Sequence, residues 1–459
     1  MPDAHSPGSA SIAFTLLFLF ALVGSTLLRL WLAGRQVRHV AQHRSSVPVA
    51  FADRITLAQH QRAADYTAAR VHLGILEMLA QAAWLIVLTV LGGLQFFIMA
   101  SGLLPESLGW LRPLLLLVLA SVTSALIDMP FAWWRQFRLE QRFGFNRMTP
   151  ALFIADALKG ALVMTVLGLP LAAAVLALMD AAGPLWWLWA WCVWMGFNIV
   201  VLLVYPTLIA PLFNRFEPLP QGEIRERVEQ LLARTGFAAG GLFVMDGSRR
   251  SAHGNAYFTG FGRSRRIVFF DTLLNQLNAD EIEAVLAHEL GHFRLKHLVK
   301  RLVMMSVASL AALALLGWLS EQTWFYEGLG VSPDAVTRNA SALLLFMLVV
   351  PVFGFLLAPL GSWLSRRDEF AADAWAAALT GPQPLASALL KLYQDNAATL
   401  TPDSLYSAVY DSHPPAPQRI GRLLAAGPAQ PGRATASALL EPDRRHRHRL
   451  ARPPASGGR

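Results

Sequence analysis

The sequence has few charged residues and almost no cysteine, and both shortages limit the classes of protein to which it can belong. Only 15% of its 459 residues are Asp, Glu, Lys or Arg, whereas soluble domains usually carry about 25%, so an ordinary soluble enzyme is disfavoured. The single cysteine, Cys192, allows neither an internal disulfide nor a cysteine metal cluster. Residues 1–10, MPDAHSPGSA, have no Lys or Arg, which does not fit the start of a secretory signal peptide.

Hydrophobic residues, by contrast, make up 54% of the chain and gather in blocks separated by short Arg-rich stretches. A helix needs about 20 apolar residues to cross the hydrocarbon core of a bilayer. Seven blocks reach that length or fall just short of it, at about 11–33, 73–100, 113–134, 151–179, 185–212, 302–319 and 341–363. The sequence therefore predicts a mainly α, polytopic membrane protein with seven transmembrane helices, the first of them uncleaved, and the lipid bilayer as a partner.

The distribution of arginine predicts the orientation in the membrane. The first and third loops carry ten arginines: Arg35, Arg38, Arg44, Arg54, Arg62, Arg70, Arg135, Arg138, Arg142 and Arg147. The connections near 100–112, 180–184 and 320–340 offer only Arg112 and Arg338. By the positive-inside rule, the N-terminus lies outside and the C-terminus lies in the cytoplasm. The net charge of +9 suits cytoplasmic loops and anionic lipid, and no basic-aromatic platform indicates a nucleic-acid partner.

Four ionisable residues lie within or beside the apolar blocks, namely Glu77, Asp128, Asp156 and Lys159. Such residues cost a few kcal/mol at the bilayer centre on insertion scales, so they are expected to avoid lipid. They either face a polar interior or pair with one another, for example Asp156 with Lys159 one turn away. Both interpretations indicate polar space between the helices.

One long soluble stretch, about 214–300, lies between the fifth and sixth blocks. Its pattern predicts a small α+β unit with a helix over GEIRERVEQLLARTG that stops at Gly236. LFVMD (242–246) and RRIVFFD (265–271) are typical of strands, with NAYFTGF (255–261) as a short extended segment between them. Asn278 followed by Glu281 predicts a capping box for a further helix that runs to about residue 299.

The sequence HELGH on this last helix indicates a metal site. His288 and His292 are four residues apart, so they share one helical face and can bind one ion, with Glu289 beside them. Zinc suits imidazole ligands, and it lowers the pKa of a bound water towards 7 so that Glu289 can take the proton. HExxH arises by chance in roughly one chain in a hundred of this length, but the setting in a soluble insertion favours a metal site.

A third ligand is needed, and the HExxHxxGxxH form fails because Leu295 and Leu298 occupy the later positions. Just after the seventh block, Glu369 and Asp373 stand four residues apart in SRRDEFAADAWAAAL. We expect Glu369 to bind zinc and Asp373 to accept a hydrogen bond from a ligating histidine. ExxxD alone is a common pattern, and its simplest interpretation is an ordinary solvated helix face.

Two further segments are weaker candidates. NAYFTGF alternates as an edge strand does and could hold a substrate backbone by strand addition, although a plain hairpin strand explains it equally well. In DSHPPAPQRI, His413 and Arg419 could donate to a developing oxyanion or orient Asp373, and a simple Pro-rich turn is the alternative. His253 and His297 are interpreted as bystanders.

Five segments together resemble a known family. They are RFGFNRMTP (142–150), SAHGNAYFTGF (251–261), HELGH (288–292), EFAAD (369–373) and SHPPAPQRI (412–420). In order and spacing they are similar to the type I CAAX prenyl proteases, integral-membrane zinc metalloproteases of the gluzincin kind. The resemblance implies a barrel of seven membrane helices around a large water-filled chamber, with zinc at its cytoplasmic side.

The resemblance also implies roles for individual residues. His288, His292 and Glu369 are implied as ligands of one zinc ion, and Glu289 as the general base. Asp373 and His413 are implied to support catalysis. Asn255 is similar to a contact for the substrate backbone, and Arg419 to a residue that binds substrate in the transition state or supports the site.

The predicted function is therefore zinc-dependent peptide-bond hydrolysis in a membrane. The predicted divisions are a five-helix membrane region at 1–213, a metallopeptidase domain at 214–425 and a disordered basic tail at 426–459. The family's namesake reaction removes the last three residues of a prenylated CaaX sequence, but the Ala- and Arg-rich composition looks bacterial. In a bacterial inner membrane, general cleavage of membrane or misfolded proteins is expected instead. The alternatives are a transporter or scaffold with structural zinc and a four-span, heat-shock type of membrane protease.

Overall fold

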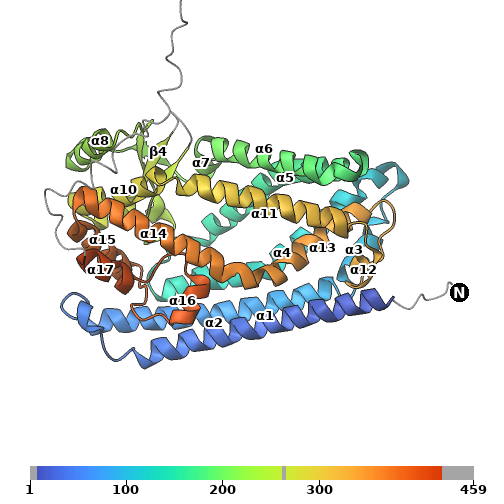
Figure 1. Cartoon of the computed structure of the whole chain (residues 1–459), viewed down its shortest axis with the longest axis horizontal. Coiled ribbons are helices and arrows are strands. Elements are labelled where there is room, and N and C mark those ends of the chain that lie inside the picture. The colour runs from blue at the N-terminus through green and yellow to red at the C-terminus, as the bar shows by residue number, and fades with distance from the viewer. Residues whose placement is uncertain (1–7, 261–264, 426–459) are drawn as a thin grey trace, which may run out of the picture.

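The computed structural model describes residues 8–260 and 265–425, so the expected tail at 426–459 and Phe261 lie outside the described residues. The described chain is mostly helical (Figure 1). Within the described residues, seven helical segments are long and apolar enough to cross a membrane: Ser9–Gln42, Leu57–Leu88, Glu106–Glu140, Pro150–Ala181, Gly183–Phe213, His297–Leu319 and Arg338–Thr380. The prediction of a seven-span, mainly α membrane protein is confirmed.

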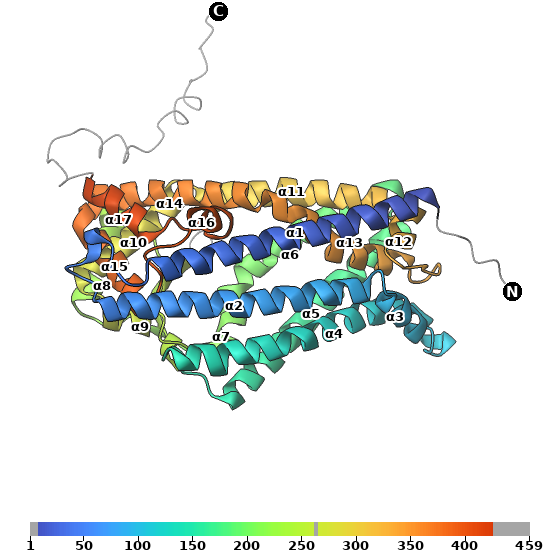
Figure 2. The same ribbon diagram turned by 90° about the horizontal axis from the view of Figure 1, so that it is seen from below.

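The long helices lie along the longest axis of the molecule (Figures 1 and 2). They are α1 (Ser9–Gln42), α2 (Leu57–Leu88), α4 (Arg112–Trp134), α5 (Pro150–Ala181), α6 (Trp186–Val204), α11 (His297–Leu319) and α13 (Arg338–Gly354). The short helices α3 (Gly93–Ser101) and α12 (Thr323–Glu327) lie at one end, near the start of α1. The soluble unit lies at the other end (Figure 1), so the start of α1 and the soluble unit are on opposite ends of the helical bundle.

The soluble unit has the predicted α+β composition. Its strands are β1 (Phe216–Pro218), β2 (Leu242–Met245), β3 (Ala256–Thr259) and β4 (Arg266–Phe270), and they form one sheet in the order β1-β2-β4-β3. β2 and β4 are parallel, with Leu242 opposite Ile267, and β3 is antiparallel to β4, with Ala256 opposite Phe269. β3 is therefore an edge strand, as the alternation of NAYFTGF predicts. Helix α8 (Glu223–Thr235) ends at Gly236, whose φ of 64° is the left-handed conformation that glycine favours.

The core of the soluble unit holds the predicted HELGH helix in place. Strand β4 contributes Ile267 and Phe269, and helix α10 (Ala279–Arg294) contributes Ile282 and Leu286, all of them at most 1% exposed. Burial of each such side chain contributes about 1.5–3 kcal/mol. Helices α9 (Asp271–Gln276), α15 (Pro382–Asp395) and α17 (Ala416–Ala425) add side chains to the same core. Helix α10 is thus fixed by the sheet and by C-terminal helices that follow the last membrane span.

The second span differs from the predicted block at 73–100. Helix α2 begins at Leu57 and ends at Leu88, and the apolar residues 93–101 form the separate helix α3. Gly92 has a φ of 80°, and a Cβ on Gly93 would lie 2.6 Å from the carbonyl oxygen of Val87. The chain therefore makes a tight turn at Gly92 and Gly93, where a larger residue would be strained or would clash. Hydrophobicity alone does not reveal that the predicted apolar block is divided here.

The ionisable residues of the spans find partners on other elements, and the suggested pairing of Asp156 with Lys159 is wrong. Asp156 accepts two hydrogen bonds from Arg250, at 2.8 and 3.1 Å, whereas Lys159 donates to the carbonyl oxygen of Leu212 at 2.7 Å. Glu77 pairs with Arg135, and Asp128 accepts a hydrogen bond from Gln81. The bidentate Arg250–Asp156 pair ties α5 to the soluble unit, which sequence spacing could not show because the two residues are distant in the chain.

Candidate metal centre and active site

The capping box at the start of α10 is confirmed. The side chain of Asn278 accepts the N–H of Glu281, and the Glu281 carboxylate accepts the N–H of Asn278, each at 2.9 Å. The same carboxylate accepts hydrogen bonds from Ser387 and Lys391 on α15, both at 2.7 Å. Hydrogen bonds from Lys391, Ser387 and the backbone outweigh burial and hold the pKa of Glu281 below its usual range. Glu281 therefore anchors α10 to the helices that follow the last span.

Close packing of α10 against α14 (Ala358–Thr380) brings the two predicted zinc segments together. A Cβ on Gly291 would lie 3.1 Å from the Cα of Ala372, which is fully buried. The small residues at these two positions allow the helix backbones to approach closely. Because α13 and α14 belong to the continuous segment Arg338–Thr380, the last membrane span carries Glu369 and Asp373 directly to the histidines.

His288, His292 and Glu369 converge on one point. The Nε2 atoms of the two histidines are 3.2 Å apart, His288 Nε2 is 3.4 Å from Glu369 Oε2, and His292 Nε2 is 3.2 Å from Glu369 Oε1. Ligand atoms about 2.0–2.2 Å from a tetrahedral zinc lie roughly 3.4 Å from one another. The spacing of these three side chains therefore fits a single tetrahedral ion, and the three form a group that could hold a metal.

The negative charges around the cluster also favour a bound cation. His288 Nδ1 lies 2.9 Å from Asp373 Oδ1, so the carboxylate holds a proton on Nδ1, and a metal ion would take the place of a second proton on Nε2. Glu369 Oε2 is buried and has no hydrogen-bond donor among the described residues. Burial lowers the pKa of His288, but the nearby carboxylates of Asp373 and Glu369 outweigh burial and raise the pKa to about 9. The negative charge around His288 thus favours a positive ion at the cluster.

Arg419 lies next to the cluster and forms a bidentate ion pair with Asp373. It donates through Nε and Nη2 to the two carboxylate oxygens of Asp373, at 2.8 and 2.6 Å. Its Nη1 lies 3.4 Å from Glu369 Oε2. Arg419 and Asp373 are only 5% and 4% exposed, so the guanidinium compensates two buried carboxylates.

Loss of this guanidinium is expected to destabilise the protein. In Arg419→Met, the side-chain volume is nearly kept but Asp373 and Glu369 lose a buried positive charge, which typically costs about 3–5 kcal/mol. Thermal unfolding in detergent should show a clear fall in Tm. Arg422→Met is the matched control, because Arg422 is an exposed arginine on the same helix and lies over the ring of Phe370. Equal Tm values for the two variants would contradict this account of Arg419.

His413 lies at the solvent side of the cluster. Its Nε2 is 3.4 Å from Glu369 Oε1, and its side chain is 63% exposed. The turn that carries it is held by Arg366 on α14, whose Nη1 donates to the carbonyl oxygens of Ser407, Ala408 and Asp411 at 2.9–3.2 Å. His413 can therefore meet a molecule that approaches the cluster from outside.

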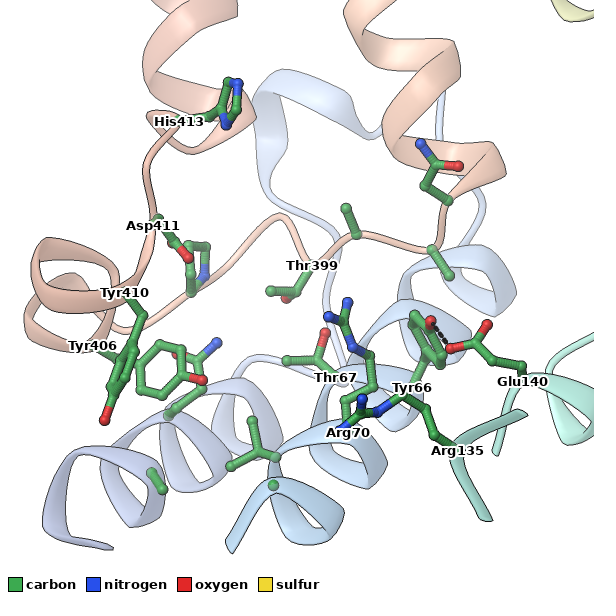
Figure 3. A pocket seen from close by; sticks show the side chains of 18 of the residues that line it. Tyr66, Thr67, Arg70, Arg135, Glu140, Thr399, Tyr406, Tyr410, Asp411 and His413 are labelled. Atoms are coloured by element: carbon green, nitrogen blue, oxygen red, sulfur yellow. Dashed lines mark hydrogen bonds between the residues drawn. The ribbon is translucent and has the colours of Figure 1, made fainter. Parts of the chain in front are cut away.

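A cavity of about 990 Å³ adjoins this turn. Residues of α1, α2, the end of the third span and the segment 393–415 line it, among them Arg29, Arg70, Asp411 and His413. Figure 3 shows His413 and Asp411 on one wall and Arg70 and Arg135 on another, with Tyr66 donating a hydrogen bond to Glu140 nearby. Both charged and apolar side chains line the cavity, and it reaches His413, whose Nε2 lies 3.4 Å from Glu369 Oε1.

Glu289 and Asn255 occupy different settings. Glu289 is half-buried on α10 next to His288, and burial raises its pKa, an effect that the nearby His288 and His292 oppose. Asn255 is exposed at the start of the edge strand β3, and its side chain accepts the N–H of Ala256 at 2.9 Å. The structure therefore brings Glu289 to the cluster, whereas the described hydrogen bonds of Asn255 are to Ala256 and, through its carbonyl oxygen, to the N–H of Phe270 on β4.

The loop RFGFN lies against the segment that precedes β3. Phe145 stacks on His253, with ring centroids 4.5 Å apart, and accepts the N–H of Ala252 at 3.1 Å. His253 also contacts Asn396 through Nδ1 at 2.7 Å. His253 lines the cavity and links the third span to the soluble unit, so it is a structural connector rather than a bystander.

His297, interpreted from the sequence as a bystander, lies in contact with His292 of the cluster. Its Nδ1 lies 2.9 Å from Nδ1 of His292, and its Nε2 lies 3.3 Å from Asp368 Oδ1. The helix predicted to run to residue 299 instead ends at Arg294, and Lys296 takes a φ of 58° before α11 begins at His297. This unpredicted break turns His297 back towards His292, and no glycine or proline signals it.

The membrane helices and the converging His–His–Glu cluster define a membrane-embedded zinc metalloprotease, and comparison with known proteins supports the same class. Residues 36–215 match the model described as CAAX prenyl protease N-terminal, five membrane helices, and residues 218–426 match Peptidase family M48. The chain belongs to Peptidase family M48. Members of this family are zinc-dependent in general and act on peptides or proteins. The resemblance stated from the sequence is confirmed, and a non-enzymatic transporter or scaffold is not supported.

Individual relatives agree with this assignment. The chain is 37% identical to CAAX prenyl protease 1 homolog of Arabidopsis thaliana, over 65% of this chain and 70% of that protein. It is also 37% identical to CAAX prenyl protease 1 of Saccharomyces cerevisiae, over 68% and 72% of the two chains. The crystal structure of Ste24p from S. mikatae superposes with a TM-score of 0.84 at 29% identity and covers 89% of this chain and 99% of that one.

Proposed function

We propose that His288, His292 and Glu369 hold one zinc ion per chain and that Glu289 is the general base for peptide-bond hydrolysis. The observation that carries this proposal is the convergence of two imidazole nitrogens and a buried carboxylate at 3.2–3.4 Å. Glu289 supports a catalytic rather than a structural site, because structural zinc needs no general base.

When bound, zinc supplies a Lewis acid that polarises the substrate carbonyl and acidifies a water molecule. Glu289 accepts a proton from the attacking water and later gives it to the departing amine. Asp373, fixed by Arg419, holds the proton of His288 on Nδ1 and thereby orients the ring. His413 stands at the open side of the cluster, where its Nε2 can donate to the oxyanion that develops on the carbonyl.

The edge strand and the cavity support an extended peptide as substrate. Strand β3, which begins after Asn255, is the outermost strand of the sheet among the described residues, and its edge can pair with a substrate backbone by strand addition. Arg419 is buried against Asp373, so a supporting role for it is favoured over direct substrate contact. The cavity beside His413 offers space for a chain that enters from between the membrane helices.

The proposed setting is a bacterial inner membrane with the metal site on the cytoplasmic side and the N-terminus outside. The Arg-rich first and third loops support this orientation. The start of α1 also lies at the end of the bundle opposite the soluble unit (Figure 1). In this setting we propose general cleavage of membrane or misfolded proteins. The relatives' names raise CaaX processing as the narrower candidate.

Cleavage of a matched peptide panel by detergent-purified protein tests the proposal. The panel holds a farnesylated CaaX peptide, the same peptide without the farnesyl group and an unrelated quenched peptide, with Glu289→Gln as the background control. General proteolysis predicts kcat/KM values within about 10-fold across the panel. A preference of more than about 100-fold for the farnesylated peptide would replace the general role by CaaX processing. Zinc-loaded protein that cleaves none of the three would contradict the proposed activity.

A further inference from the structure

We propose that His297 and Asp368 are a positioning pair that fixes the tautomer and ring orientation of His292 for metal binding. This inference rests on the proposed zinc site, and it assigns a role to two residues that neither HELGH nor EFAAD contains. His297 is 2% exposed, and both of its ring nitrogens face polar partners.

The contacts form a chain with one consistent direction of hydrogen bonding. For His292 Nε2 to offer its lone pair to an ion, the ring proton must be on Nδ1. That proton points at Nδ1 of His297, 2.9 Å away, which must then be the acceptor. The proton of His297 is therefore on Nε2, where Asp368 Oδ1 accepts it at 3.3 Å. Asp368 thus acts on His292 through His297.

The backbone is arranged to make these contacts. Lys296 adopts a left-handed conformation with a φ of 58°, which a non-glycine residue rarely takes, and the turn returns His297 to the face of His292. Asp368 directly precedes the proposed ligand Glu369 on α14. Asp368 therefore comes from the same helix as Glu369, and His297 comes from the start of α11, just after the helix that carries His288 and His292.

The two ligating histidines consequently have different supports. His288 donates directly to Asp373, and Asp373 also accepts a hydrogen bond from Arg419. His292 has an imidazole in place of a carboxylate as its first partner, and the carboxylate stands one step further away. Any buried histidine needs hydrogen-bond partners, but here the acceptor nitrogen of His297 faces a proposed ligand and its donor nitrogen faces a carboxylate, the arrangement that orients a ligating ring.

Zinc affinity of the full-length protein in detergent, measured by competition with a chromophoric chelator, tests the pair. Removal of a group that orients a metal ligand typically lowers metal affinity about 10–100-fold, and this range is expected for His297→Phe. Asp368→Asn is expected to cause a smaller loss in the same direction. Lys300→Gln is the matched control, because Lys300 Nζ lies 3.7 Å from Asp368 Oδ1 and the variant leaves the His292–His297–Asp368 contacts in place.

Double variants separate this role from a general loss of structure. Asp368→Asn should add nothing in a His297→Phe background, because both act through His292, whereas Asp373→Asn should add its full effect because it acts through His288. The visible absorption of cobalt-substituted protein should change in His297→Phe and stay unchanged in Lys300→Gln.

The possible failures are distinguishable. If wild-type protein binds no zinc, the proposed function fails and this inference fails with it. If wild-type protein binds zinc and folded His297→Phe keeps wild-type affinity and cobalt spectrum, only the positioning pair is overturned. If His297→Phe does not fold, the nearly isosteric Asp368→Asn decides by the same affinity measurement, and unchanged affinity overturns the pair.

Discussion

Glu289→Gln is expected to lower kcat for peptide hydrolysis by about 10²–10⁴-fold while zinc content stays at the wild-type value. The amide has nearly the shape of the carboxylate, but it cannot accept the proton of the attacking water. Glu289 is outside the group of converging ligand atoms, so its replacement leaves His288, His292 and Glu369 in place. Steady-state cleavage of a quenched peptide, with metal analysis of the same samples, measures both quantities.

The control for this experiment is Glu283→Gln, on the same helix. Glu283 is partly buried and pairs with Arg234 at 3.4 Å and with Arg227 at 3.7 Å, away from the metal cluster. This variant should keep both cleavage and zinc. Wild-type turnover by Glu289→Gln would remove the general base from the mechanism, and a loss of zinc in Glu289→Gln would show a structural role instead.

Glu369→Gln is expected to weaken zinc binding by at least about 100-fold and to abolish cleavage with it. Removal of groups that only orient ligands costs about 10–100-fold in affinity, and a direct ligand contributes more. The neutral amide also removes the negative charge that lies between His288 and His292. Zinc content after gel filtration and affinity by chelator competition measure the change.

Glu281→Gln provides the comparison for Glu369→Gln. Glu281 is also a buried carboxylate, at 3% exposed, but it bonds Ser387 and Lys391 and lies at the start of α10. We expect Glu281→Gln to lower Tm without a change in zinc affinity. Zinc affinity that survived in folded Glu369→Gln would exclude Glu369 as the third ligand.

The elements that the sequence predicts well are those with a local and repetitive signal. The seven apolar blocks can be recognised because each membrane span must be one continuous apolar helix, in which all backbone hydrogen bonds are made within the span. The HELGH helix is visible because a capping box marks its start at Asn278 and its histidines share a face. The convergence of Glu369 on His288 was predictable only as a hypothesis, since it depends on the close contact of Gly291 with Ala372.

The elements that the sequence does not reveal depend on contacts between distant residues or on unusual backbone. The end of α10 has no glycine or proline, because Lys296 itself takes the left-handed conformation. The sequence therefore predicts that His297 is part of one continuous helix with His292. The spacing of Asp156 and Lys159 suggests a pair, whereas the partner of Asp156 is Arg250, in a different segment.

Cleavage by wild-type protein before and after removal of its zinc tests the central claim most directly. The purified protein would be dialysed against a chelator, assayed with a quenched peptide, and assayed again after one equivalent of zinc per chain is restored. The account predicts one zinc ion per chain at the start, loss of cleavage when zinc is removed and recovery when it returns. Full cleavage by zinc-free protein would contradict it.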